Sequence, residues 1–310
     1  MKQLIVITGQ TATGKTELAT SIAKEVHGEL ISADSRQAYK NLDIITGKDL
    51  LSTSKFVLNE EINSKYSIGY YENYKTKTWL YDIINPRVVF SAGEWALCAR
   101  EAIRKIEENS KIPIIVGGSY FYIRTLLYGL SVPRTEPDWN LRVSLEEKSV
   151  SDLQDKLNKL QPHIVETMNN SDQNNKRRLI RRIEILSNQT KQELTTAKGI
   201  AQDYDVTLIG LRYNKKENLE RAIRTRVEKR MEEGALSEIE TLLRMGYSST
   251  DPGLQTIGYA QLLHHIESDI DLYASIEIWV VKERQYAKRQ MTFMTKNSSI
   301  LWYNVDPTNK

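Results

Sequence analysis

The stretch that decides the fold is GQTATGKT, residues 9–16, which directly follows the apolar run LIVIT at residues 4–8. It fits the pattern G-x-x-x-x-G-K-[ST], in which glycines let backbone amides turn inward around phosphate oxygens. Lys15 adds a point charge to this loop, and the hydroxyl of Thr16 is a ligand for Mg²⁺. We therefore predict that the chain binds a phosphorylated or diphosphorylated small molecule through residues 9–16.

Helices and strands alternate along the chain around this loop. The spacing of Leu18, Ile22 and Val26 predicts a helix that begins at Thr16, and the positive N-terminal end of this helix faces the bound anion. Further units run through ELISADSRQAY (29–39), WLYDIINP (79–86), and a helix at 93–107 followed by a strand at 112–116. This alternation predicts an α/β fold with a P-loop NTPase-like, doubly wound parallel sheet.

The strand signals stop between about residues 133 and 200, where polar helical segments and turn-rich joints take over. We interpret residues 133–200 as an inserted helical lobe in a core made of residues 1–132 and 201–310. The core is expected to resume with the strand VTLIGLRY and to end with ILWYNV, with long helices at 217–245, 255–266 and 272–296. The stretch 63–78 is rich in Tyr and Lys, which predicts a mobile loop, with a plain surface hairpin as the alternative.

Composition excludes several classes of protein. The 310 residues are 40% hydrophobic and 27% charged, with a net charge of +3, which is typical of an ordinary globular protein. The single cysteine, Cys98, is expected to be a buried small hydrophobe, so a disulfide framework is excluded. The first apolar run is too short for a signal peptide, and no run has membrane-spanning length. We therefore expect a cytoplasmic protein with no membrane partner.

A carboxylate and an amide follow the second predicted strand. Asp34 and Gln37 lie where the carboxyl ends of parallel strands face the ligand crevice. Asp34 can act as a helix N-cap or as an outer group of a Mg²⁺ site. Together with Gln37, one turn away, it can also present an acceptor and an amide to a purine edge. Ser119 follows another strand-to-turn junction and offers a hydroxyl to the same crevice.

Three predicted helices carry clustered cations. In KRRLIRRIEIL, residues 176–186, four arginines lie along adjacent rows of one helix face. Such a run is usually a solvated face, but LERAIRTRVEKR (219–230) and KERQYAKRQMTF (282–293) add two more basic helices, the latter with Tyr286 and Phe293. Charge mixed with stacking surface is used on single-stranded or looped RNA, so we predict an RNA partner.

Two other functions remain open on these residues alone. A P-loop kinase for a nucleoside or small metabolite would share the strand, loop and helix. A noncatalytic RNA-binding protein would use the loop only to hold a structural anion. The presence of Lys15, Thr16 and Asp34 together argues against mere binding, because binding alone needs no base.

Six blocks resemble, in order, the tRNA dimethylallyltransferases, also called tRNA isopentenyltransferases: GQTATGKT, SADSRQAYKNLDI, IVGGSYFYIRTLLYGL, KRRLIRRIEIL, QTIGYAQLL and YAKRQMTF. The blocks span nearly the entire chain. The resemblance implies transfer of a dimethylallyl group from dimethylallyl diphosphate to N6 of adenosine 37, next to the anticodon, in tRNAs reading codons that start with U. We expect Mg²⁺ as the cofactor, the tRNA anticodon stem-loop as the partner, and a monomeric enzyme.

The resemblance also assigns roles to residues of this chain. It implies that Asp34 is the general base and that Asp34, Lys15 and Thr16 are the catalytic groups. It places the diphosphate on Gly9, Gln10, Thr11, Ala12, Thr13, Gly14, Lys15, Thr16 and Arg226. It places tRNA contacts on Asp34, Ser35, Arg36, Gln37, Ser119, Arg142, Arg177, Arg178, Arg181, Gly258, Tyr259, Lys288, Arg289 and Gln290.

The chain departs from the family pattern at several positions. Gln10 stands where the family usually has proline, and Ser119 replaces a threonine but keeps the hydroxyl. Ala222 falls where many relatives have arginine, which leaves Arg221, Arg224 or Arg226 to contact the diphosphate; we choose Arg226. Four further departures remove no group that the chemistry requires: Ile45, Trp79, Arg182 and Phe293.

Overall fold

The structure is a computed structural model that describes residues 1–62, 65–73, 75–130, 138–188, 197–268 and 270–306. The chain divides into two compact units. We call Met1–Tyr128 together with Gly199–Lys310 the core unit, and Gly129–Lys198 the helical unit. The helical unit is thus an insertion in the sequence of the core unit.

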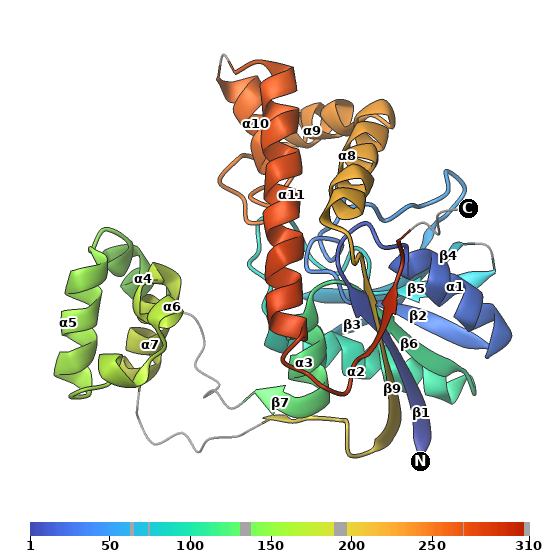
Figure 1. Ribbon diagram of the computed structural model, residues 1–310, viewed down its shortest axis with the longest axis horizontal. Coiled ribbons are helices and arrows are strands. Elements are labelled where there is room, and N and C mark those ends of the chain that lie inside the picture. Colours follow the sequence, from blue (N-terminus) through green and yellow to red (C-terminus); the bar gives the residue numbers. More distant parts are fainter. Residues whose placement is uncertain (63–64, 74, 131–137, 189–196, 269, 307–310) are drawn as a thin grey trace. The chain divides into compact units, whose positions relative to one another are not determined.

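Eight strands of the core unit form one sheet in the order β10-β9-β1-β6-β2-β5-β4-β3 (Figure 1). The neighbours from β10 to β5 all pair in parallel, which confirms the predicted doubly wound α/β fold. These parallel strands are β1 (Lys2–Gly9), β2 (Gly28–Ser32), β5 (Thr76–Trp79), β6 (Ile112–Val116), β9 (Tyr204–Arg212) and β10 (Leu301–Asn304).

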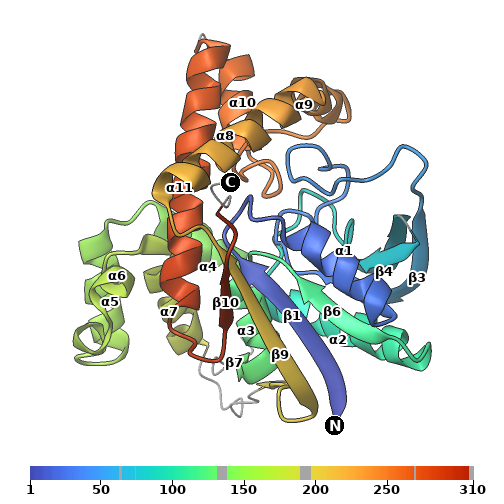
Figure 2. The same cartoon turned by 45° about the vertical axis from the view of Figure 1, so that its right-hand side comes forward.

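Helices cover both faces of this sheet. In β1, Val6 packs into one apolar cluster and Ile7 into another, because successive side chains of a strand point to opposite faces. Helix α1 (Lys15–Glu25) lies on one face, and α2 (Ala92–Glu108) and α3 (Tyr120–Tyr128) lie on the other (Figure 2). The central strands are therefore apolar on both sides, as parallel strands in such folds are.

Cys98 lies within α2 and is fully buried, as predicted. Burial raises the pKa of its thiol to about 12, because a thiolate is poorly stabilised away from water. The side chain therefore packs as a small hydrophobe and is not a nucleophile.

Two antiparallel strands extend one edge of the sheet. These are β3 (Phe56–Ile62) and β4 (Tyr66–Asn73), and β4 pairs with β5. The mobile loop expected at 63–78 is therefore wrong for the described part of that stretch, and the hairpin alternative holds; residues 63, 64 and 74 lie outside the described residues. Its described tyrosines, at 66, 70 and 71, are strand residues: Tyr66 is buried, and the Tyr70 ring centre lies 4.9 Å from that of Trp79.

Among the described residues of the core unit, four helices follow β9: α8 (Lys216–Glu232), α9 (Ala235–Arg244), α10 (Tyr259–Glu267) and α11 (Leu272–Met294). The single helix expected at 217–245 is wrong, because Gly234 breaks it. Gly234 has φ of +101°, a left-handed backbone conformation that ends α8 and turns the chain into α9. Of the predicted unit at 79–86, only Trp79 lies in a strand, as the last residue of β5, since Leu80 and Asp82 have positive φ.

The helical unit has its own small core. Leucine and isoleucine side chains of this unit are buried against one another, at Leu145, Leu153, Leu157, Ile164, Leu179, Ile180 and Ile183. Its elements are β7 (Gly129–Leu130), α4 (Trp139–Glu146), α5 (Val150–Leu160), a 3-10 turn at Val165–Thr167, α6 (Asn170–Gln173), α7 (Lys176–Ser187) and β8 (Ala197–Lys198). Strands β7 and β8 pair in antiparallel fashion.

Candidate active site

The phosphate-binding loop connects β1 to α1, as the sequence predicts. A Cβ atom at Gly9 would lie 2.1 Å from the carbonyl oxygen of Leu211, so only glycine fits where the loop leaves the sheet. Ala12 and Gly14 then adopt left-handed conformations with φ of 61° and 74°. Lys15 begins helix α1 directly after this turn. The loop therefore surrounds the N-terminal end of a helix, which favours an anion.

Two glutamine side chains hold the phosphate-binding loop in place through hydrogen bonds. The Thr11 amide donates to Oε1 of Gln290 at 2.9 Å, and Nε2 of Gln290 donates to the Gly118 carbonyl at 3.0 Å. Oε1 of Gln10 accepts from the Tyr213 amide at 2.8 Å. Both side chains are buried, so Gln290, predicted as a tRNA contact, uses its amide inside the protein. Gln10, the departure from proline, likewise ties the loop to the end of β9.

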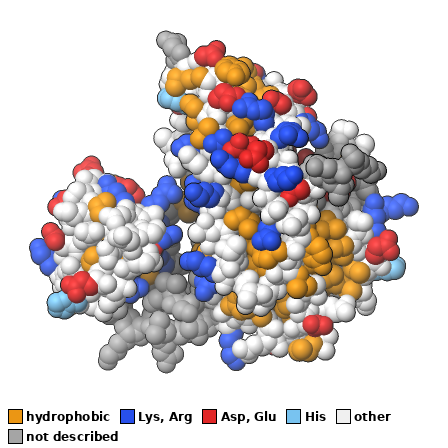
Figure 3. Space-filling view, in the orientation of Figure 1, with side chains coloured by type: hydrophobic (Ala, Val, Ile, Leu, Met, Phe, Trp, Pro, Cys, Tyr) orange, Lys and Arg blue, Asp and Glu red, His pale blue; other side chains and the backbone are white. Residues whose placement is uncertain are grey.

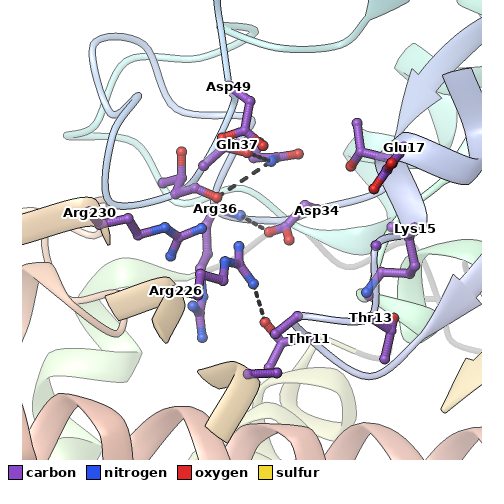
Figure 4. Close-up of a pocket in the computed structure, with 18 of the residues that line it drawn as sticks. Thr11, Thr13, Lys15, Glu17, Asp34, Arg36, Gln37, Asp49, Arg226 and Arg230 are labelled. Atoms are coloured by element: carbon purple, nitrogen blue, oxygen red, sulfur yellow. Dashed lines mark hydrogen bonds between the residues drawn. The ribbon is translucent and has the colours of Figure 1, made fainter. Parts of the chain in front are cut away.

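Lys15 points from the loop into the cavity (Figure 4). Its Nζ donates to the Gln10 carbonyl oxygen. Burial and the nearby cation Arg226 lower the pKa of Lys15 to about 7, because an ammonium removed from water beside another positive charge is less stable. Asp34 acts in the opposite direction but does not offset this effect. A bound anion would restore the charged form.

Asp34 lies two residues beyond β2 in a tight turn. Its Oδ1 accepts from the Arg36 amide at 2.9 Å, which fixes the carboxylate at the cavity wall. The Ser35 amide donates to Oγ of Ser119 at 3.0 Å, so Ser119 holds this turn from the end of β6. The main chain of the turn that carries Asp34 is therefore joined to the second strand-to-turn junction.

Gln37 also lines the cavity, but its amide has partners in the protein. Oε1 accepts from Oγ of Ser32 at 2.8 Å, and Nε2 donates to the Gly47 carbonyl at 2.7 Å. Gln37 thereby connects the turn after β2 to the loop that contains Gly47. This contact positions the loop, and it is an arrangement that the sequence pattern did not predict.

These groups surround one cavity of about 720 Å³ in the core unit. The predicted site residues that line it are Thr11, Ala12, Thr13, Gly14, Lys15, Thr16, Asp34, Arg36, Gln37, Arg226 and Gln290. The phosphate-binding loop and the Asp34 turn, separated by about one βα unit in sequence, therefore face the same space (Figure 4). An anion held by the loop would lie opposite a carboxylate that can accept a proton.

Arg36 is fixed on the side of the cavity formed by α11. Its Nη1 donates to Oε1 of Glu283 at 2.8 Å, and its guanidinium lies 4.5 Å from the centre of the Tyr286 ring. Glu283 is 3% exposed. Burial alone would raise the pKa of Glu283, but Arg36, Arg226 and Arg230 lower it, so the carboxylate stays charged. Sequence patterns gave no sign of this buried pair.

Helix α8 supplies cations to the opposite wall. Arg226, the arginine expected to contact the diphosphate, donates from Nη1 to Oγ1 of Thr11 in the phosphate-binding loop and lines the cavity. Arg224 pairs instead with Glu277 of α11 at 2.5 Å. Arg230, one turn beyond Arg226, also lines the cavity and is 4% exposed. Arg230 was missed by sequence reasoning, although its spacing of four residues from Arg226 places both on one helix face.

Other predicted tRNA contacts in the core unit lie away from this cavity. Tyr259 is buried, and its Oη donates to Oε2 of Glu238 at 2.6 Å. A Cβ atom at Gly258 would lie 2.3 Å from the side chain of Ile45, so Gly258 allows close packing. Exposed cations lie over α8 and α11 (Figure 3), at Lys216, Arg224, Lys282, Arg284, Lys288 and Arg289. Arg221 and Lys229 of α8 are also exposed, but they line the cavity.

The predicted tRNA contacts of the helical unit differ in their surroundings. Glu184 is fully buried, and it accepts from Nε and Nη2 of Arg142, each at 2.9 Å, and from Nη1 of Arg181. Arg178 is paired with Asp172. Arg177 is exposed on α7. The cationic stripe is thus partly a structural feature that joins α4 to α7.

The amino-acid sequence matches two family models and is similar to known enzymes over nearly its whole length. The sequence model of the IPP transferase family matches residues 37–297, and that of the isopentenyl transferase family matches residues 2–63. A tRNA dimethylallyltransferase of Alkaliphilus oremlandii is 33% identical over 98% of this chain and 92% of its own length. A tRNA dimethylallyltransferase of Acetivibrio thermocellus is 34% identical over 99% of this chain and 93% of its own length.

Solved structures show the same similarity in three dimensions. The tRNA isopentenylpyrophosphate transferase of Bacillus halodurans superposes with a TM-score of 0.66 at 28% identity, covering 98% of this chain and 90% of that one. A eukaryotic dimethylallyltransferase acting on tRNA superposes with a TM-score of 0.73 at 25% identity, covering 98% of this chain and 74% of that one.

Proposed function

Since the chain belongs to the tRNA dimethylallyltransferase family, we propose that its core cavity transfers a dimethylallyl group from dimethylallyl diphosphate to N6 of adenosine 37, next to the anticodon. The chain is a tRNA-modifying prenyltransferase. The substrates are tRNAs that read codons starting with U. One observation carries this assignment: the phosphate-binding loop and the Asp34 carboxylate line the same cavity.

The exocyclic amine of adenine is a weak nucleophile, because its lone pair is delocalised into the ring. The reaction therefore depends on a good leaving group. As the bond between C1 and the diphosphate oxygen breaks, negative charge grows on the diphosphate. The amides of residues 11–16, the ammonium of Lys15 and the guanidinium of Arg226 are placed to stabilise that charge.

Asp34 is the proposed general base. Its carboxylate accepts the proton that N6 loses as the new bond to C1 forms. The Arg36 amide and the Ser35–Ser119 contact fix the turn that carries it, so the carboxylate is oriented before the substrate arrives. Arg36 and Gln37 complete the wall against which the adenine would lie.

The cavity fits Mg²⁺ held mainly by its substrate. Across the described part of the chain, no group of three or more carboxylate, histidine or cysteine side chains can hold a metal ion. Mg²⁺ commonly keeps waters and binds through one or two protein groups plus phosphate oxygens, and the hydroxyl of Thr16 at the mouth of the cavity suits that role. When bound, the ion neutralises charge on the departing diphosphate.

The nucleic-acid partner is tRNA, and its anticodon stem-loop is the proposed contact. The target base must leave its stack to reach the cavity, which costs a few kcal/mol. Exposed cations, including Lys288 and Arg289 on α11 and Arg177 on α7, supply phosphate contacts that offset this cost. In the described residues, no helix combines the length and apolar character needed to span a bilayer. We further propose that the enzyme is cytoplasmic, because its tRNA substrate is found in the cytoplasm. We also propose that it is monomeric.

The proposal is tested by incubating the purified protein and Mg²⁺ with radiolabelled dimethylallyl diphosphate and unmodified tRNA that carries adenosine 37. Label is expected in the RNA, and digestion should locate it on N6 of that adenosine. A matched tRNA with guanosine at the same position is the control and should stay unlabelled. Absence of label from both RNAs, with phosphate transferred from ATP to a nucleoside instead, would establish a kinase.

A further inference from the structure

Three consecutive turns of α8 face the cavity at positions 222, 226 and 230. Residues four apart on a helix lie on the same face, so these positions form one row. Ala222 begins the row with a methyl group, at the position where an arginine was expected by resemblance. Arg226 and Arg230 follow with two guanidinium groups. The positive charge of this row is therefore concentrated at its two later positions.

Arg230 is a buried cation with an unusual environment. It is 4% exposed, and neither a hydrogen bond nor an ion pair links it to another residue in the described part of the chain. Its neighbour Arg226, by contrast, donates to Thr11 of the phosphate-binding loop. Burial and the positive charge of Arg226 lower the pKa of Arg230 to about 9. A guanidinium held this way destabilises the ligand-free protein, since burying a charge without a partner is costly.

Gly47 lies directly against the guanidinium groups of Arg226 and Arg230. It has φ of +68°, and a Cβ atom there would lie 2.2 Å from Nη2 of Arg230 and 3.3 Å from Nη2 of Arg226. The backbone of Gly47 is held by Gln37, whose Nε2 donates to its carbonyl at 2.7 Å. The chain therefore lets both arginines pack directly against the main chain at the cavity wall, where a side chain would block them.

We propose that Arg230 is a second diphosphate-binding arginine, which acts beside Arg226. This role rests on the proposed transfer reaction. Both guanidinium groups bind the diphosphate of the allylic substrate. When the bond between C1 and oxygen breaks, its electron pair stays on the diphosphate, the bond between N6 and C1 forms, and the N6 proton passes to Asp34. Arg230 stabilises the departing anion during this step, and it gains there the direct hydrogen bonds to an anion that neither Glu283 nor Asp49, the nearby carboxylates, supplies.

The test compares Arg230→Met with Arg224→Met, a change of the same size and charge on the same helix but outside the cavity. Binding of inorganic diphosphate with Mg²⁺ is measured by calorimetry. Initial rates are measured with either dimethylallyl diphosphate or tRNA as the varied substrate. Arg230→Met should weaken diphosphate binding about 10- to 100-fold, the usual worth of hydrogen bonds to a charged group, and should raise KM for dimethylallyl diphosphate while leaving KM for tRNA unchanged. Arg224→Met should leave diphosphate binding and KM for dimethylallyl diphosphate unchanged.

Thermal unfolding of the ligand-free variants separates this role from a scaffolding one. Arg230→Met should unfold at a higher temperature than the unmodified protein, because it removes a buried charge without a partner. Arg230→Lys, which keeps a charge but not the planar fork, should restore binding only in part. Intact diphosphate binding together with a lower unfolding temperature would overturn the proposal in favour of scaffolding. A rise in KM for tRNA alone would overturn it in favour of an RNA contact.

The binding measurement also keeps this proposal separate from the transfer reaction. If the unmodified protein binds diphosphate but places no label on tRNA, the proposed function fails, and the comparison of Arg230→Met with Arg224→Met still decides whether Arg230 binds the anion. If label is transferred and Arg230→Met binds diphosphate as tightly as the unmodified protein, only the role of Arg230 fails.

Discussion

The arginines of the core cavity and those of the helical unit have different partners. In the cavity, Arg226 reaches the phosphate-binding loop, and Arg230 is buried without a hydrogen bond or ion pair to another described residue. In the helical unit, Arg142 and Arg181 converge on the buried carboxylate of Glu184. Arg181, Arg226 and Arg230 all appear in the sequence within clusters of cations on helices. The surroundings of each guanidinium, rather than the density of charge, indicate which ones are directed at a ligand.

This difference assigns distinct tasks to the two units. A cation held at a cavity wall without a protein partner destabilises the free protein and gains its counter-charge from the substrate. A cation bound to a buried carboxylate stabilises its own unit and contributes less to binding. We therefore expect variants in the core cavity to change diphosphate chemistry, and variants around Glu184 to change stability first.

The largest expected effect concerns the general base. Asp34→Ala should lower turnover by about 10²- to 10⁴-fold, the usual contribution of a positioned acid or base, while tRNA affinity is largely retained. Single-turnover rates measured with saturating tRNA, together with filter binding of tRNA, separate the two quantities. Asp49→Ala, another carboxylate at the cavity wall, is the control. Turnover equal to that of the unmodified protein would remove Asp34 from catalysis.

The next effect concerns the buried carboxylate of the helical unit. Glu184→Gln keeps the shape of the side chain but removes its charge, and should destabilise α7 by about 1–3 kcal/mol, the cost of losing hydrogen bonds to a charged group. Hydrogen exchange of the α7 amides measures this change. The exposed pair of Arg178 and Asp172 provides the control, since Asp172→Asn should cost less than about 1 kcal/mol. Equal protection in both variants would show that the arginines around Glu184 are not structural.

A smaller effect follows from the low pKa of Lys15. Its pKa of about 7 in the folded protein is below the value of 10.5 for an exposed lysine, so the unfolded state binds more protons between these pH values. Lys15 therefore destabilises the folded state most below pH 7, and this penalty fades as the pH rises toward 10.5. Lys15→Met should raise the Tm of the ligand-free protein by a few degrees at pH 6 and by less at pH 9, at about 2–4 °C per kcal/mol.

The control for this pH dependence is Lys24→Met, which removes an exposed lysine from the same helix. The change in Tm caused by Lys24→Met should be the same at both pH values. A Tm difference for Lys15→Met that does not depend on pH would contradict a buried, partly neutral Lys15.

Local patterns were sufficient to predict the loop and much of the site. The G-x-x-x-x-G-K-[ST] pattern placed residues 9–16 correctly between a strand and a helix, because glycine spacing and apolar periodicity are local properties. The strand-end rule likewise brought Asp34 to the cavity that Lys15 lines. The roles of these side chains in the reaction stay predictions.

Features that depend on distant partners were not predictable in this way. The contacts of Gln37 with Gly47 and of Arg36 with Glu283 join segments far apart in sequence, and only the fold brings them together. In the sequence, Arg230 cannot be told from the other cations of its helix, because its burial depends on the packing of α8 in the fold. The Tyr- and Lys-rich composition of residues 63–78 favoured a loop, whereas the tyrosines at 66–71 belong to β4, which pairs with β3 and β5.

The most direct test measures two Michaelis constants in two variants, one from each unit. Arg226→Ala should raise KM for dimethylallyl diphosphate about tenfold or more and leave KM for tRNA unchanged. Arg177→Ala should raise KM for tRNA a few-fold and leave KM for dimethylallyl diphosphate unchanged. The slope of the logarithm of the tRNA binding constant against the logarithm of salt concentration should become shallower by about one. That crossed result is the one expected if cavity cations bind the diphosphate and exposed cations bind RNA. The same change in both constants for both variants would contradict the division of tasks.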